Sequence, residues 1–439
     1  MGEHKIINDP VHGTIRISGP LLDLASTPEV NRLNQIRQLG LAYLVFPGAQ
    51  HTRFEHSMGV SHVAGLLGRA LGIDKEEISL IQTAGLLHDL GHGPFSHTME
   101  RIFYERIGKE HMALTKDIIT GNVENWGGGS WKLDEIGRGK NIPDIIRKYG
   151  MEPEAVAALV CQEGSSPLPG QELLSVQDEQ TFFSNKHYLY QIIHSALDAD
   201  QLDFLLRDSH YTGVAYGIID LDRIVNTSTL FHGEFMVEKR GISSLEGMLV
   251  ARSLMYSSVY FHKTARIAES MLCRAGDHLS DEELMMIWGM ADTEALHYMG
   301  KKDGIVGNLA ARLRFRRLYK CAYRIGSEEV SEDIEGRIKE LSAQRERSHL
   351  EREIERKLSM TEGSVIIDVP DPSLTLSEPR LRRTDIKVLG DRPEILSRIS
   401  SLARALQHRP PLNWCLMVSC PEEYREKVAV LAQRVILSD

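Results

Sequence analysis

Apolar residues recur at helical intervals through most of the first 325 residues, and this periodicity restricts the chain to a mainly α-helical fold. Asp74 and Glu77 have the spacing of a capping box and predict the start of one helix. Its apolar positions are Leu80, Ile81, Ala84 and Leu87. A preceding stripe comprises Val60, Val63, Leu66, Leu67 and Ala70. We interpret both stripes as buried core, and we expect a later helix from Tyr188 to Ser209.

Three successive segments are predicted along the chain. Residues 1–325 form a helical domain whose metal core spans about residues 50–215 and whose Gly- and Asn-rich stretch 121–150 is an insertion or mobile loop. Residues 326–361 alternate Glu with Lys and Arg, which predicts a solvent-exposed helical connector. Residues 362–439 contain the strand-like runs SVIIDVP, DIKVLG and NWCLMVSC with two helical stretches. The expected fold is therefore mainly α, with a helical core and a small C-terminal α+β domain.

Charge and composition narrow the classes of function. The formal net charge of -10 argues against a nucleic-acid-binding surface, because phosphate backbones attract basic faces. The five cysteines form no CxxC pair, and the N-terminal MGEHKIINDP has no apolar signal segment, so we expect a cytoplasmic location. We also expect no membrane span, because no run approaches about 18 uninterrupted apolar residues.

The segment LLHDLGHGPFSH concentrates residues that bind metals and move protons. His88 and Asp89 are adjacent at the expected end of an apolar helix, and His92 and His97 follow across a Gly-Pro turn. Solvent-exposed histidines at a capped helix end are the alternative interpretation, but three histidines and an aspartate within ten residues make a metal or catalytic site the stronger one.

Other parts of the chain must complete such a site. His56 stands upstream in RFEHS, and the segment HSALDADQLDFLLRD stands downstream. In that segment Asp198 and Asp200 are both candidate ligands, and Asp200 shares a helix face with Asp203 and Arg207. Two imidazoles with two carboxylates suit one divalent transition metal, Fe, Mn, Zn, Ni or Co, and leave positions open for water and phosphate.

The sequence resembles the HD-domain phosphohydrolases through the ordered pattern H…HD…D. It resembles more closely the sterile-alpha-motif/HD dNTP triphosphohydrolases, without their sterile-alpha-motif domain. The matching segments are NDPVHG, QIRQLG, YLVFPGAQHTRFEHSMGV, AGLLHDLGHGPFSH and DADQLDFLLRD. The resemblance is strong over about residues 5–270 and weaker but collinear to the end.

The resemblance implies roles for individual residues. The implied metal ligands are His56, His88, Asp89 and Asp200. The implied reaction centre comprises His92, His97, Glu100 and His111, with His97 as the acid. The implied substrate-binding residues are Gln38, Leu39, Arg53, Asp208, Arg252, Tyr260, His262 and Lys263. Among these, Arg53 would hold phosphate oxygens, while Gln38 and Asp208 would read the sugar 3′-hydroxyl.

Several positions depart from the family pattern. The family's phosphate-binding Lys is Gln201 here, and its nearby Tyr is Phe204, so a cation and a phenol that would contact the triphosphate are absent. An allosteric guanine-nucleotide site between subunits would lose its charged base contacts, because Ser26 and Asn34 replace an Asp and an Arg. An allosteric phosphate rim would still comprise Lys5, Asn8, Arg316 and Lys320. A basic surface helix is the alternative interpretation of the last two.

The resemblance implies a metal-dependent hydrolase that converts deoxynucleoside triphosphates to nucleoside and triphosphate, with Mg²⁺ on the substrate phosphates as a further expectation. It also implies self-association as a dimer or tetramer. Two alternatives remain open: an HD phosphatase or phosphodiesterase acting on another nucleotide, and a nucleotide-sensing protein with little catalysis.

Overall fold

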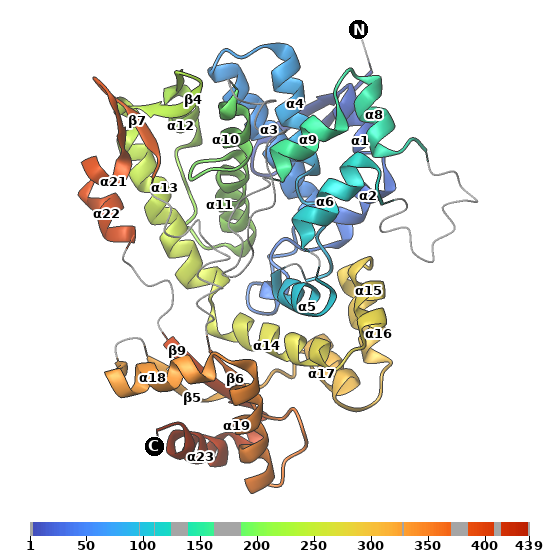
Figure 1. The fold of residues 1–439 in the computed structure, drawn as a ribbon, viewed down its shortest axis with the longest axis vertical. Helices are drawn as coiled ribbons and strands as arrows, with labels where there is room; N and C mark the ends of the chain where they lie inside the picture. The colour runs from blue at the N-terminus through green and yellow to red at the C-terminus, as the bar shows by residue number, and fades with distance from the viewer. Residues whose placement is uncertain are drawn as a thin grey trace.

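The structure, a computed structural model, describes residues 3–95, 97–108, 110–123, 139–161, 186–326, 329–369, 385–407 and 414–437. It is mainly α-helical, with small sheets, as the periodicity predicts (Figure 1). No helix within these ranges is both long enough and apolar enough to cross a membrane.

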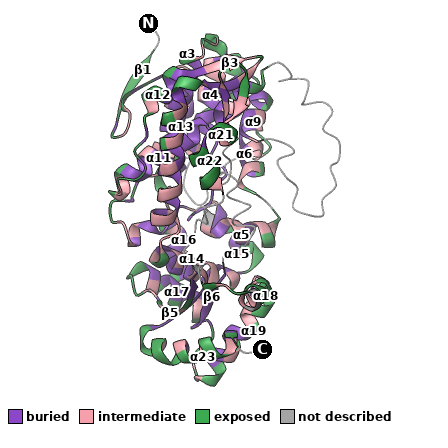
Figure 2. Cartoon of the chain, turned by 90° about the vertical axis from the view of Figure 1, so that its left-hand side faces the viewer, coloured by how far each residue is buried: buried purple, intermediate pink, exposed green. Residues whose placement is uncertain are grey.

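Three helices form the centre of the larger, helical body: α3 (Arg53–Ala70), α4 (Lys75–Leu87) and α11 (Ala199–Thr212). Helix α3 packs against both of the others. A capping box of Thr52 and Glu55 begins α3, and the Asp74 side chain accepts the Glu77 N–H at the start of α4. Both expected apolar stripes are largely buried, and Figure 2 shows the buried residues gathered along these helices. The caps and stripes therefore fix the elements that carry the site.

Other helices surround this centre. Those before α11 are α1 (Pro20–Leu24), α2 (Pro28–Arg32), α5 (His97–Ile107), α6 (His111–Thr120), α8 (Ile142–Lys148), α9 (Pro153–Val160) and α10 (His187–Ile193). Those after it are α12 (Leu221–Thr227), α13 (Ile242–Met255), α14 (Lys263–Asp277), α15 (Asp281–Trp288), α16 (Asp292–Gly300) and α17 (Gly304–Arg314). A π-helical turn, Tyr256–Tyr260, continues α13.

The single helix expected from Tyr188 to Ser209 is two helices, α10 and α11, and that expectation is corrected. Between them Asp198 accepts the N–H groups of Ser195 and Gln201 and becomes the N-cap of α11. Aspartate and serine side chains compete with helical hydrogen bonding in this way. The break matters for the site, because it sets where α11 and Asp200 begin.

Three sheets accompany the helices. Strands β1 (His4–Asp9) and β2 (Gly13–Ser18) form an antiparallel hairpin. The second sheet has the order β3-β4-β7-β8, and in it β4 and β7 are parallel. Its strands are β3 (Ser228–Phe231), β4 (Glu234–Glu238), β7 (Lys387–Leu389) and β8 (Pro393–Ile395). The third sheet has the antiparallel order β5-β9-β6 and comprises β5 (Lys320–Gly326), β6 (Ile366–Asp368) and β9 (Trp414–Cys420).

The C-terminal part is divided between two hydrophobic cores. This division differs from the expected arrangement of three successive segments. A second core contains β5, β6 and β9 with α18 (Glu332–Leu341), α19 (Gln344–Lys357) and α23 (Arg425–Leu437). It therefore begins near residue 320, before the expected boundary at 362. Residues 386–403, with α21 (Leu396–Ile399) and α22 (Ser401–Gln407), pack instead on the helical body.

The expected connector and insertion also differ in part. The connector forms the two helices α18 and α19, but α19 buries Glu351 and Glu355. These two carboxylates accept the N–H groups of Ile367 and Val365. Within the expected insertion, residues 124–138 lie outside the described ranges, and α8 packs against α1 and α6.

Candidate metal centre

Three predicted metal ligands from three helices converge in the buried centre of the helical body. One ligand atom of each of His56, His88 and Asp200 lies within 4.8 Å of the others. His56 comes from α3, His88 caps the C-terminal end of α4, and Asp200 lies in the first turn of α11. All three are buried, so the donors are brought together in the interior of the helical body. By contrast, Asp198, the rival carboxylate of the sequence prediction, is used as the N-cap of α11.

The orientation of His88 fits a metal ligand. Its Nδ1 lies 2.8 Å from the Gly85 carbonyl oxygen, which can only accept, so Nδ1 carries the proton. Its Nε2 is buried without a hydrogen-bond partner among the described residues. An orphaned imidazole nitrogen beside a second imidazole and a carboxylate is suited to a divalent transition ion.

His56 lies between two carboxylates. Its Nε2 is 3.0 Å from Asp200 Oδ1, and its Nδ1 is 2.7 Å from Asp203 Oδ2. Burial disfavours the charged imidazolium, but these two hydrogen-bonded carboxylates outweigh burial and raise the pKa of His56 to about 10. Asp203 therefore sets the ring orientation of His56, as the outer partners of metal-binding histidines commonly do.

Asp203 is the hub of a fully buried network that the sequence analysis did not assign. It accepts hydrogen bonds from His12 Nε2 at 2.6 Å and from Arg207 Nε and Nη2 at 2.9 Å each. Arg207 Nη1 also reaches Asp9 Oδ2 at 2.8 Å. Burial disfavours the Asp203 carboxylate, but Arg207, His12 and His56 hold its pKa well below the usual range. The sequence offered two signals for this network, the segment NDPVHG and the helix face shared by Asp203 and Arg207. Neither signal shows that the two segments contact each other.

Gly59 makes this network possible. A Cβ atom at Gly59 would lie 1.8 Å from Asp203 Oδ1 and 2.5 Å from Arg207 Nη2. Only a glycine on α3 lets α11 approach so closely while Asp203 supports His56. The small residue is therefore part of the support of the metal centre.

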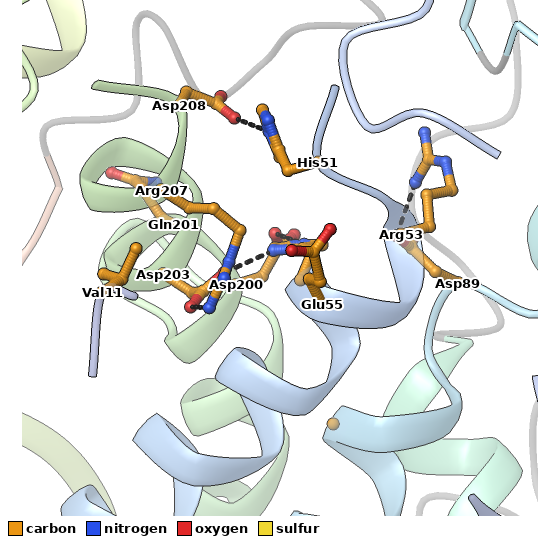
Figure 3. Close-up of polar contacts among 12 residues, drawn as sticks. Val11, His51, Arg53, Glu55, Asp89, Asp200, Gln201, Asp203, Arg207 and Asp208 are labelled. Carbon is orange, nitrogen blue, oxygen red and sulfur yellow. Dashed lines mark hydrogen bonds and ion pairs between the residues drawn. The ribbon is translucent and has the colours of Figure 1, made fainter. Parts of the chain in front are cut away.

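Asp89, the fourth predicted ligand, lies beside the three-residue group. Its Oδ1 is 3.3 Å from His88 Nε2 and 3.4 Å from His92 Nε2. Its Oδ2 accepts a hydrogen bond of 2.5 Å from Arg53 Nη1, which Figure 3 shows. Burial disfavours the charge, but Arg53 and the two histidines hold the pKa of Asp89 well below its usual range. A carboxylate and a guanidinium are thus held together at the edge of the site.

The predicted reaction centre forms a second cluster. His92, Glu100 and His111 also have ligand atoms within 4.8 Å of one another. The His92 and His111 rings stack with centroids 4.0 Å apart, and His111 Nδ1 hydrogen-bonds to Glu100. Burial, followed by the nearby Arg53 charge, lowers the pKa of His92 well below its usual value. The backbone of His97 begins α5, but its side chain lies outside the described part of the structure.

The predicted sugar-binding residues are linked by hydrogen bonds. Asp208 accepts from Tyr260 at 2.5 Å and pairs with His51 Nε2 at 2.8 Å, and the second contact is drawn in Figure 3. His51, which the sequence analysis missed, stacks on Tyr211. Gln38 donates its backbone N–H to the His51 carbonyl oxygen, and its buried Oε1 has no partner among the residues described.

The two residues that replace the family's Lys and Tyr, Gln201 and Phe204, both contact other predicted substrate-binding residues. Gln201 is buried and accepts a hydrogen bond of 3.1 Å from Arg252 Nη1, while Phe204 contacts the Tyr260 ring edge-on. His262 accepts the Thr264 N–H and caps α14. Two further predicted residues are Leu39, which is partly buried, and Lys263, which is exposed.

The four residues of the predicted phosphate rim lie on different elements. Lys5 and Asn8 are exposed on β1, whereas Arg316 and Lys320 are exposed beside and on β5. Figures 1 and 2 place β1 near one end of the molecule and β5 near the other.

Parts of the chain are similar to known proteins. Two family models match: the HD domain over residues 53–138, and the HD associated region over residues 219–437. A protein of Methanocaldococcus jannaschii is 33% identical over 320 residues, which cover 72% of this chain and 59% of that protein. The human deoxynucleoside triphosphate triphosphohydrolase SAMHD1 is 30% identical over 285 residues, which cover 62% of this chain and 44% of that protein. The chain thus spans roughly half the length of these relatives.

Solved structures share the fold over nearly the whole chain. A hypothetical protein from Aquifex aeolicus superposes with a TM-score of 0.67 at 24% identity, covering 98% of this chain and 99% of that one. A phosphohydrolase from Bacteroides thetaiotaomicron superposes with a TM-score of 0.63 at 25% identity, covering 96% and 100%. From the converging histidines and aspartate and from both matched regions, the chain belongs to the HD phosphohydrolase family.

Proposed function

We propose that this protein hydrolyses deoxynucleoside triphosphates to nucleoside and triphosphate in a metal-dependent reaction. The observation that carries the proposal is the buried group His56, His88 and Asp200, in which the His88 Nε2 has no hydrogen-bond partner among the described residues. The human and other relatives named deoxynucleoside triphosphate triphosphohydrolases support the choice of substrate.

The proposed cofactor is one divalent transition ion, Fe, Mn, Zn, Ni or Co, held by His56, His88 and Asp200 with Asp89 adjacent. Such an ion supplies polarisation of the phosphorus–oxygen bond and activation of a water molecule. A Mg²⁺ ion on the substrate phosphates is a further part of the proposal.

The protein's own residues hold the phosphates and move protons. Arg53, already oriented by Asp89, offers the planar guanidinium that grips phosphate oxygens. His97 is the proposed acid at the leaving oxygen, and the Glu100–His111 pair orients it. His92, whose pKa burial and the Arg53 charge hold well below its usual value, lies beside Asp89 at the same edge of the site.

The proposed sugar contacts are the hydrogen-bonded residues around Asp208. Gln38 and Asp208 read the 3′-hydroxyl, and Tyr260 packs against the sugar. Leu39 lies beside the base, and the remaining proposed substrate contacts are Arg252, His262 and Lys263. The buried Gln38 Oε1, which has no partner among the described side chains, supports this role.

Product analysis tests the reaction directly. Purified protein is incubated with mixed deoxynucleoside and ribonucleoside triphosphates plus Mn²⁺, and nucleoside, monophosphate, phosphate and triphosphate are resolved. We expect nucleoside and triphosphate from the deoxynucleotides. Monophosphate or phosphate would favour the phosphatase alternative, and no product with any metal would favour a nucleotide sensor.

His97→Ala separates proton transfer from metal binding. We expect turnover to fall by about 10²–10⁴-fold, the usual contribution of a general acid, while the metal content stays at one equivalent. Metal analysis and steady-state kinetics on the same preparation measure both quantities. Loss of the metal in this variant would contradict the proposed division of roles.

Gln201 favours the second candidate, a phosphatase or phosphodiesterase, because a buried amide replaces a cation at the phosphate side. In Gln201→Lys the new ammonium group would meet the buried Arg252 guanidinium. We expect the free energy of unfolding to fall by about 1–3 kcal/mol without nucleotide. If polyphosphate lies there, thermal denaturation will show a larger stabilisation by a deoxynucleoside triphosphate in the variant than in the wild type. Equal stabilisation of both proteins would mean that the triphosphate lies elsewhere.

Self-association as a dimer or tetramer is part of the proposal, because Lys5 and Asn8 lie on β1, whereas Lys320 begins β5 and Arg316 donates to the Leu44 carbonyl oxygen. With Ser26 and Asn34 in place of charged base-reading residues, we propose that guanine-nucleotide regulation at this rim is lost or altered. Micromolar activation specific to dGTP would disprove this part.

A further inference from the structure

A cavity of about 100 Å³ lies between the helical body and the second core, apart from the metal centre. Its walls come from α5, α14, α19 and β6. Figure 1 shows α14 running between α5 on one side and β6 with α19 on the other. The segments that meet here are far apart in the sequence, so the cavity exists only in the folded chain.

The cavity is rich in arginine. Four guanidinium groups line it: Arg101, Arg266, Arg274 and Arg347. Three carboxylic acids also line it: Asp277, Glu351 and Asp368. Burial raises the pKa of Asp277 and of Glu351, but the lining still has four guanidinium groups against three carboxyl groups. The balance of the lining is therefore positive.

Two of the arginines are structural. Arg266 donates Nε and Nη2 to the two Asp368 oxygens at 2.9 and 3.0 Å, and Arg274 Nη2 donates to Glu351 at 2.5 Å. These pairs tie α14 to β6 and α19. Arg347 Nη1 donates to the carbonyl oxygens of Leu341 and Ser342 at 3.0 and 2.7 Å, which holds this guanidinium at the cavity wall.

Arg101 is held more loosely than the others. It forms an ion pair of 3.7 Å with Glu105 on the same helix, and the Glu105 side chain is 44% exposed. Thr98 and Arg101 lie one turn apart on α5 and both face the cavity. An incoming anion can therefore engage Arg101 without breaking a buried pair.

We propose that this arginine cavity binds a phosphate group, either free phosphate or the phosphate end of a larger molecule. Arginine offers paired donors that match phosphate oxygens. A volume of about 100 Å³ accommodates an oxyanion but is below the roughly 300 Å³ of pockets that enclose whole small molecules. The site is independent of the proposed hydrolysis, because none of its lining residues is a proposed ligand or catalytic group.

Equilibrium dialysis of the full-length, metal-loaded protein with radiolabelled orthophosphate tests the proposal, with tripolyphosphate and dATP as further probes. We expect Arg101→Gln to weaken one class of phosphate sites by about tenfold or more, as expected for loss of a charge-assisted contact. The matched control is Arg147→Gln on α8, an exposed arginine 3.9 Å from Asp144, which should bind as the wild type does. Hydrogen exchange should slow in α5 and α19 on binding.

A second variant tests the proposal independently of whether Arg101→Gln folds. Gln344 is exposed at the cavity wall, so Gln344→Glu adds a repelling charge without disturbing a core, and it should also weaken phosphate binding. Arg53→Gln should leave this class of sites intact. If orthophosphate binds and its binding depends on Arg101, the ligand is free phosphate. If dATP binding depends on Arg101 but orthophosphate does not bind there, the ligand is the phosphate end of a larger molecule. Wild-type binding of all probes by Arg101→Gln, or loss of all binding in Arg53→Gln, would overturn the proposal.

Discussion

Asp200→Ala is expected to lose the metal ion and to lower phosphohydrolase turnover by more than about a hundredfold. Loss of a residue that only supports a metal ligand costs up to about a hundredfold, and loss of a ligand itself should cost more. Asp200 offers the carboxylate that meets His56 and His88, and no other residue of α11 is in that group. Metal content by mass spectrometry and turnover of deoxynucleoside triphosphates measure the two losses.

Asp198→Asn is the matched control for this prediction. Asp198 is two residues away, is also buried, and differs in that its side chain caps α11. Asparagine can accept the same Gln201 N–H, so metal content and turnover should stay near wild type. If Asp198→Asn lost the metal while Asp200→Ala kept it, the assignment of the carboxylate ligand would be reversed.

Gly59→Ala is expected to lower the free energy of unfolding by about 3–5 kcal/mol, the usual cost of breaking a buried ion pair. The added Cβ would lie 1.8 Å from Asp203 Oδ1, so the Asp203–Arg207 pair must move. His56 then loses the partner that orients its ring, and metal affinity should fall about 10–100-fold. Chemical denaturation and metal titration give the two values.

Gly247→Ala provides the comparison. Gly247 lies within α13, and a Cβ there would meet no atom within 4 Å. The substitution should raise the free energy of unfolding by about 0.5–1 kcal/mol, because alanine favours the helix. Equal effects of the two substitutions, in sign and size, would contradict the close approach of α3 and α11.

The sequence was most informative about the fold class and about the metal-binding residue types that stand close together in one segment. The helical periodicity predicted the mainly α fold, and the HD segment with Asp200 predicted residues that the structure brings together. The choice between Asp198 and Asp200 was left open by the residues themselves. It depends on which carboxylate caps α11, and only the break after α10 decides this.

Long-range support could not be predicted from the sequence. His12 and Asp9 reach Asp203 and Arg207 from a hairpin almost 200 residues away in the chain, and no local pattern specifies that contact. His51 beside Asp208 was missed for the same reason. The boundary at residue 362 failed because strand-like runs show that strands exist but not which sheet each one joins.

The parallel pairing of β4 with β7 has a consequence for synthesis on the ribosome. About 150 residues separate Glu238 from Lys387, so the edge of β4 stays open while that length is translated, roughly 7–30 s at about 5–20 residues per second. An open strand edge invites association with other chains. Nascent chains released before residue 387 should therefore aggregate, although every residue of the metal centre has already been made.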